Sequence, residues 1–79
     1  MKAFVKTKKG PGNVGVMEKE DPHLTEDGLL IQIVAAGVCH SDLLMIDWGP
    51  TVEEEYRPPL PLVMGHEFSG RVMKTGPFV

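Results

Sequence analysis

The single cysteine and one of the three histidines in this chain of 79 residues are candidate zinc ligands. Cys39 is the only cysteine, so it can form no disulfide within the chain. It follows a strand-like segment and precedes a predicted helix, and N–H groups at a helix N-terminus favour the thiolate, the form that binds metals. A buried thiol is the competing interpretation, because free cysteine is among the most buried residue types. By itself, Cys39 is therefore a metal ligand, a nucleophile or a packed apolar residue.

His66 is the second candidate, and it directly precedes a predicted strand over residues 67–75. A lone histidine is more often a polar surface or core residue, but Cys39 and His66 together suit Zn²⁺. Two protein ligands are too few, since catalytic zinc usually has three and a water. Glu67 is either the third ligand or a group that orients the metal from behind. On a strand, His66 and Glu67 would face opposite ways, so both reach one metal only if the strand bends or has not begun.

Two polar residues beside Cys39 have the chemistry to support such a site. Asp42 can accept the other ring N–H of His66, as carboxylates behind metal-bound histidines do. Ser41 can hydrogen-bond a metal-bound alkoxide and carry its proton outward. His23, by contrast, lies in a charged loop and is expected to be solvated. The candidate residues all flank predicted strands, where functional sites are commonly built.

Alternating apolar residues predict the strands that must position these side chains. The expected strands cover residues 1–7, 14–18, 29–36 and 67–75. Both faces of residues 29–36 are mostly apolar, which predicts a central strand. The whole chain, residues 1–79, is expected to form a single small unit of mainly β type.

One short helix and one long loop are predicted between the third and fourth strands. The helix is expected over residues 43–47, capped by Ser41 or Asp42 and stopped by Gly49-Pro50. Residues 51–61 lack periodicity and contain three prolines, so they predict a loop whose second half is polyproline-like.

Composition excludes several classes of function. Eight basic and 11 acidic residues give a net charge of −3, which argues against nucleic-acid binding. The longest apolar stretch, residues 28–38, is too short to span a membrane, and no signal peptide begins the chain, so a cytoplasmic protein is expected. No G-x-G-x-x-G follows a strand, and there is no P-loop or H-E-x-x-H. The 79 residues are too few for both a dinucleotide domain and a substrate domain.

The chain resembles the N-terminal part of the zinc-dependent medium-chain alcohol and polyol dehydrogenases. Two runs carry the resemblance: Gly37-Val38-Cys39-His40-Ser41-Asp42 and Gly65-His66-Glu67-Phe68-Ser69-Gly70. Met1-Lys2-Ala3 and the run VMKTG at residues 72–76 also fit, so the resemblance covers nearly all of the chain. It implies an incomplete, truncated GroES-like β-barrel. The Rossmann domain that binds NAD or NADP in this family is absent from the 79 residues.

The resemblance also implies a metal centre. Cys39 and His66 match ligands of the catalytic zinc in this family. Glu67 matches a glutamate that binds the zinc directly in some members, notably polyol dehydrogenases, and lies behind it in others. In the family, the zinc acts as a Lewis acid on the alcohol oxygen while hydride passes to nicotinamide.

Three neighbours of Cys39 take roles from the same resemblance. Ser41 matches the hydroxyl that passes on the alcohol proton, and Asp42 matches the carboxylate that supports the zinc-bound histidine. His40 stands where some relatives place a basic residue near the cofactor pyrophosphate. Leu44 departs from the pattern, because many alcohol dehydrogenases have a relay histidine there.

The expected function is therefore that of an NAD(P)-dependent oxidoreductase acting on a secondary alcohol or polyol. The 79 residues alone are expected to be inactive, because hydride transfer needs a nicotinamide held against the substrate. The alternative is a non-catalytic, self-associating β-module with a vestigial metal site; a zinc-free relative of the quinone reductases is a third reading. Unpaired strand edges and uncovered apolar faces predict a homo-oligomer.

Overall fold

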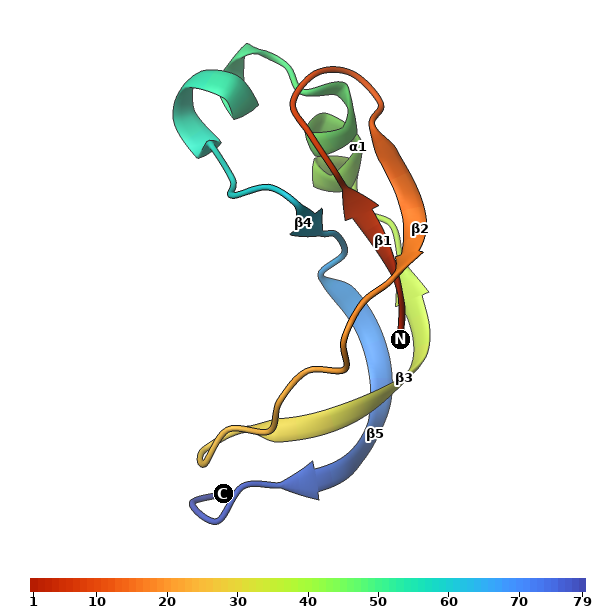
Figure 1. The fold of residues 1–79 in the computed structure, drawn as a ribbon, viewed down its shortest axis with the longest axis vertical. Helices are drawn as coiled ribbons and strands as arrows, with labels where there is room; N and C mark the ends of the chain where they lie inside the picture. Colours follow the sequence, from red (N-terminus) through yellow and green to blue (C-terminus); the bar gives the residue numbers. More distant parts are fainter.

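In the computed structural model, which describes residues 1–79, the strands form two separate antiparallel sheets (Figure 1). The first sheet has the strand order β2-β1-β4, with β1 at Lys2–Lys6, β2 at Val14–Glu18 and β4 at Leu62–Val63. The second pairs β3 (Leu29–Gly37) with β5 (Glu67–Thr75). Neither sheet closes on itself, which confirms the prediction of a mainly β, partial GroES-like barrel.

The β1–β2 hairpin holds most of the small core. Alternation along β1 buries Ala3 and Val5 on one face. The connection between the two strands contains Gly10, Gly12 and Asn13, all with positive φ, at 93°, 73° and 54°. Glycine adopts this backbone region without steric cost, and asparagine tolerates it better than most residues. The loop can therefore curl back tightly enough to pair the two strands.

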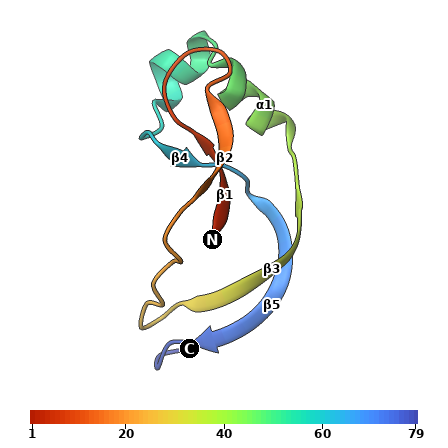
Figure 2. The ribbon, with the colours of Figure 1, turned by 45° about the vertical axis from the view of Figure 1, so that its right-hand side comes forward.

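Strands β3 and β5 form a long, bowed ribbon that extends away from the hairpin (Figure 2). The prediction that residues 29–36 form a central strand is wrong, because β3 pairs with β5 alone. Ile33 and Val34 are 53% and 66% exposed, although their side chains belong to opposite faces of the strand. An apolar pattern on both faces shows only that a strand is suited to burial. Whether the strand is buried depends on the neighbouring strand and on the layers that cover it.

Helix α1 (His40–Asp47) begins three residues earlier than predicted. Its N-cap is Cys39, which has the extended backbone of a cap residue, with φ −98° and ψ 159°. The prediction of Ser41 or Asp42 as the cap is wrong because Asp42 lies at the third helical position and bonds back to the cap residue, the acidic half of a capping box. Trp48 is the C-cap: its N–H donates to the Leu44 carbonyl, and its positive φ of 53° turns the following chain out of the helix.

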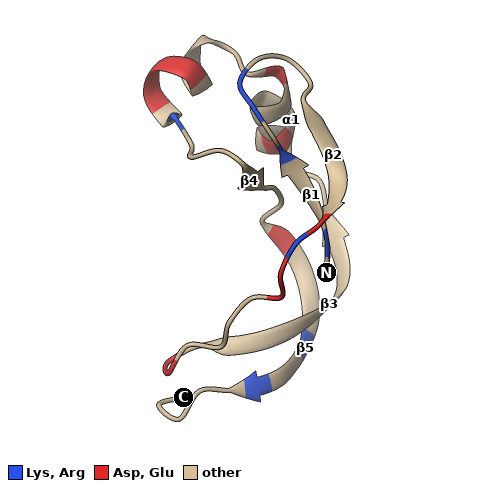
Figure 3. Ribbon diagram, viewed as in Figure 1, with Lys and Arg blue, Asp and Glu red and all other residues tan.

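The first half of residues 51–61, predicted as loop, contains a π-helical turn, η1 (Val52–Tyr56). Val52 is buried and anchors this turn, while its three glutamates form the red segment of η1 in Figure 3. A single apolar residue among charged residues creates no hydrophobic periodicity, so the sequence pattern does not predict this turn. Neither α1 nor η1 has the length and apolar character needed for a helix to cross a membrane.

Candidate metal centre

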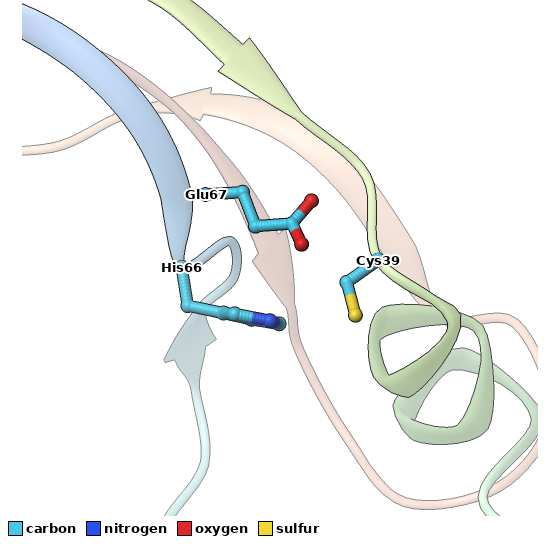
Figure 4. Close-up of side chains that lie close together, drawn as sticks. All are labelled: Cys39, His66 and Glu67. Carbon is cyan, nitrogen blue, oxygen red and sulfur yellow. The ribbon is translucent and has the colours of Figure 1, made fainter.

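Cys39, His66 and Glu67 come together where β3 ends and β5 begins (Figure 4). The pairing of Gly37 with Glu67 is the last of the β3–β5 register, so it brings the segment after β3 beside the segment before β5. Figure 4 shows the Cys39 sulfur, the His66 ring and the Glu67 carboxylate directed toward a common space. The ribbon therefore joins residues that lie far apart in the sequence.

The spacing of the three side chains suits a metal ion. Their ligand atoms all lie within 4.8 Å of one another. Ligand atoms on a tetrahedral zinc lie roughly 3.5 Å apart, given bonds of about 2.0–2.3 Å. Small rotations of exposed side chains would close that difference, since Glu67 and His66 are both exposed.

The sequence left open whether His66 and Glu67 could face the same ion, and the local backbone allows it. Strand β5 begins at Glu67, so His66 lies outside the pleat that would have turned the two side chains apart. Gly65, just before His66, has a φ of 101°, which reorients the chain at this point. Gly37 gives room across the ribbon, because a Cβ there would lie 3.2 Å from Glu67 Oε2.

Asp42 is buried and connects two of the candidate ligands. Its Oδ2 accepts a hydrogen bond from the Cys39 backbone N–H at 2.9 Å. Its Oδ1 lies 3.5 Å from His66 Nδ1. One carboxylate at the start of α1 thus holds the backbone of Cys39 and faces the imidazole of His66.

The electrostatic surroundings favour an ionised cysteine. Hydrogen bonding from Ser41, and then from His66, lowers the pKa of the Cys39 thiol, against the opposing effects of burial and Glu67. Cys39 in turn raises the pKa of His66, with Asp42 and Glu67 acting in the same direction and burial opposing them. The neighbouring imidazole thus favours the thiolate of Cys39, and the thiolate is the form of cysteine that binds metals.

The other predicted residues divide into two groups. Ser41 and His66 line one small cavity of about 190 Å³, which Cys39 and Glu67 do not line, so Ser41 lies on the His66 side of the cluster. His40 is exposed at the first position of α1 and does not line this cavity. Met45 forms an apolar wall of the same cavity and is not among the residues predicted from the sequence. Met45 follows Ser41 by one helical turn, so a helix correctly begun at His40 would have placed both on one face.

Comparison with known proteins identifies the class of this fold and site. Residues 25–79 match the family described as the alcohol dehydrogenase GroES-like domain. The chain belongs to this family, and the resemblance drawn from the two sequence runs is confirmed.

Individual relatives are dehydrogenases. The chain is 38% identical over 76 residues to an L-threonine 3-dehydrogenase of Streptomyces avermitilis, covering 96% of this chain and 21% of that protein. It is 38% identical to a sorbitol dehydrogenase of Halalkalibacterium halodurans (76 residues; 96% and 20%) and 35% identical to a D-arabitol-phosphate dehydrogenase of Enterococcus avium (77 residues; 96% and 20%). The chain thus spans about a fifth of the length of these relatives. No solved structure matches it.

Proposed function

We propose that this chain supplies the metal-binding part of an NAD(P)-dependent dehydrogenase acting on secondary alcohols or polyols. The observation that carries the proposal is the convergence of a thiol, an imidazole and a carboxylate within 4.8 Å at the end of the β3–β5 ribbon. The names of the relatives support the reaction class, since they describe dehydrogenases for threonine, sorbitol and arabitol phosphate.

The donor set fits zinc. Thiolate sulfur, imidazole nitrogen and carboxylate oxygen are the three ligand types that Zn²⁺ takes from proteins. Three protein ligands, of which His66 also lines a cavity, match a catalytic site, which keeps one position for water or substrate, better than a closed structural site with four. When bound by Cys39, His66 and Glu67, zinc would act as a Lewis acid on the hydroxyl oxygen of an alcohol.

The residues around the cluster have separate tasks in this proposal. Ser41 is exposed and borders the cavity, so its hydroxyl can accept the alcohol proton and pass it to solvent. Asp42 holds the backbone of Cys39 and orients the His66 ring. A bound oxidised nicotinamide would supply the hydride acceptor for the substrate carbon, so that the secondary alcohol would be oxidised to a ketone. The 79 residues contain no dinucleotide fingerprint, and they are assigned no part in binding the nicotinamide.

A metal titration tests the proposal directly. We expect the chain to bind one Zn²⁺, or Co²⁺ as a coloured substitute, and we expect Cys39→Ala to abolish this binding. His66→Ala should weaken it strongly, whereas the matched control His23→Ala, which changes an exposed histidine in a loop, should leave it unchanged. Unaltered stoichiometry in Cys39→Ala would place any bound metal elsewhere and overturn the proposal.

Activity gives a second test. We expect the 79 residues alone to oxidise no alcohol, because positioning of the nicotinamide against the substrate supplies much of the rate. NAD-dependent oxidation of sorbitol by the highly purified chain would contradict the prediction that the 79 residues alone are inactive.

Self-association is a second candidate function, and the β3–β5 ribbon favours it. Each of the two strands has a single neighbour, so each leaves one edge of free N–H and C=O groups. Large apolar side chains on the ribbon are exposed, including Ile33, Val34 and Phe68. We propose that copies of the chain pair through this ribbon as a homo-oligomer. Sedimentation equilibrium over a concentration series tests this homo-oligomer. A folded species that keeps the monomer mass at every concentration would overturn the proposal of self-association.

A further inference from the structure

Lys6 is fully buried, with 0% of its surface exposed, in a chain that buries only six of its 79 residues. Lysine is almost never fully buried unless its ammonium group is paired. Here three backbone carbonyl oxygens accept its hydrogen bonds: those of Gly10, of Gly12 at 2.5 Å and of Ile46 at 2.9 Å. The donor capacity of the ammonium is therefore complete, since it has three N–H groups.

The three carbonyls come from two different parts of the fold. Gly10 and Gly12 belong to the β1–β2 turn, while Ile46 lies in the last turn of α1. The ammonium also lies 5.5 Å from the ring centroid of Trp48, the C-cap residue of the same helix. Lys6 thus ties the hairpin to the C-terminal end of α1, where the backbone N–H of Gly12 also donates to Ile46.

The charge of Lys6 suits this position. The C-terminal end of a helix carries a partial negative charge that cations stabilise, yet the last turn of α1 contains no basic residue of its own. Lys6 supplies the missing cation from β1. Burial lowers the pKa of Lys6, and the nearby Asp47 carboxylate opposes that shift.

The opposite end of α1 carries the complementary arrangement. Asp42, the other buried charged residue of the chain, lies in the first turn, where the helix dipole favours an anion. Asp42 holds the Cys39 backbone and faces His66. The two buried charges therefore stand at the two ends of one eight-residue helix, which is about 12 Å long and behaves as a stiff rod.

We propose that Lys6 is a positioning residue of the metal centre. By binding the C-terminal end of α1, it fixes the place and tilt of the helix, and hence the positions of Cys39 and Asp42 at the other end. The part of this inference that concerns the metal rests on the proposed function above. A side chain 33 residues before Cys39 in the sequence then controls the geometry of the ligand cluster through the helix.

Cobalt binding tests this proposal. In Lys6→Met, a side chain of similar length without donors, we expect Co²⁺ affinity to fall about tenfold and the thiolate-to-cobalt absorption band to shift, as when other outer partners of a ligand set are lost. Lys2→Met, on the same strand but exposed, is the matched control and should change neither. A folded Lys6→Met with the affinity and absorption band of the unaltered chain would overturn the proposal. If Lys6→Met does not fold, the same two measurements are made on Lys6→Gln, whose amide can still donate to part of the carbonyl cluster. Unaltered affinity and an unaltered absorption band in that variant would then overturn the proposal.

Amide hydrogen exchange in the absence of metal tests whether Lys6 fixes the position of α1. We expect the Cys39 N–H, which donates to Asp42, to exchange about tenfold faster in the Lys6 variant, while amides of the β3–β5 ribbon keep their rates. If the unaltered chain binds no cobalt, the proposed function fails, and this exchange measurement alone decides on Lys6. Equal Cys39 exchange in the variant and the unaltered chain would overturn the inference.

Discussion

Asp42→Asn is the substitution that examines the metal centre most closely. The asparagine is almost the same size, and its amide oxygen can still accept the hydrogen bond from the Cys39 N–H. The negative charge is lost at a residue that is 9% exposed and that lies in the first turn of α1. The change therefore separates the charge of Asp42 from its shape.

Three contributions set the size of the effect. Replacing a charged acceptor by a neutral one costs about 1 kcal/mol, and removing an anion from a helix N-terminus costs about 0.3–1 kcal/mol. The relief of carboxylate burial offsets part of this loss. We expect a net loss of about 1 kcal/mol in the free energy of unfolding. Metal affinity should fall more, by about 10- to 100-fold, because Asp42 supports two candidate ligands.

The pH dependence of this loss has a definite sign. Asp42 is one of the groups that raise the pKa of His66, so the asparagine variant should titrate His66 at lower pH. Protons then compete less well for the imidazole in the variant. The loss of metal affinity should consequently be largest where His66 is neutral in both proteins, and it should shrink as the pH falls through the raised pKa of His66.

Asp47→Asn is the matched control for Asp42→Asn. It removes the same charge from the other end of the same helix, at an exposed residue. Loss of an anion from the helix C-terminus is favourable, whereas loss of its attraction for Lys6 is unfavourable, so the net change should stay within about 0.5 kcal/mol. Cobalt titration, urea unfolding and the NMR titration of His66 measure these quantities. Equal metal affinity in the two variants would refute the role assigned to Asp42.

Three further predictions concern the backbone and the ligands. Gly65→Ala should lower the free energy of unfolding in urea by about 1–2 kcal/mol and weaken cobalt binding, because alanine resists a φ of 101°. Gly49→Ala is the control and should be tolerated, because Gly49 has open space around it and no positive φ. Equal losses in the two variants would contradict this prediction. Gly70→Ala should cost about 2 kcal/mol, since its Cβ would lie 2.5 Å from the Gln32 carbonyl oxygen, and an unchanged urea midpoint would show that the ribbon adapts. Metal affinity should fall as the pH is lowered from neutral, because protons compete for the thiolate of Cys39 and for its imidazole partner; a flat pH profile in calorimetry would exclude both ligands.

The strands were largely predictable because their signal is local. The predicted bounds of residues 14–18 and 67–75 agree with β2 and β5, where alternation and flanking turn residues lie within a few positions. The family was also predictable, because two short runs contain its characteristic residues. The start of α1 was missed because the side chain of Asp42 bonds backward to Cys39, which places it inside the helix and not at its cap.

The sequence by itself determined which residue types were available for metal chemistry, but it did not bring them together. Only the β3–β5 register, which ends at Gly37 and Glu67, places Cys39 beside His66, and such long-range pairing depends on the whole ribbon. Lys6 shows the same limit more sharply. A lysine in an alternating strand predicts a solvated charge, and its burial became favourable only when folding brought three carbonyl oxygens from two distant segments around one ammonium group.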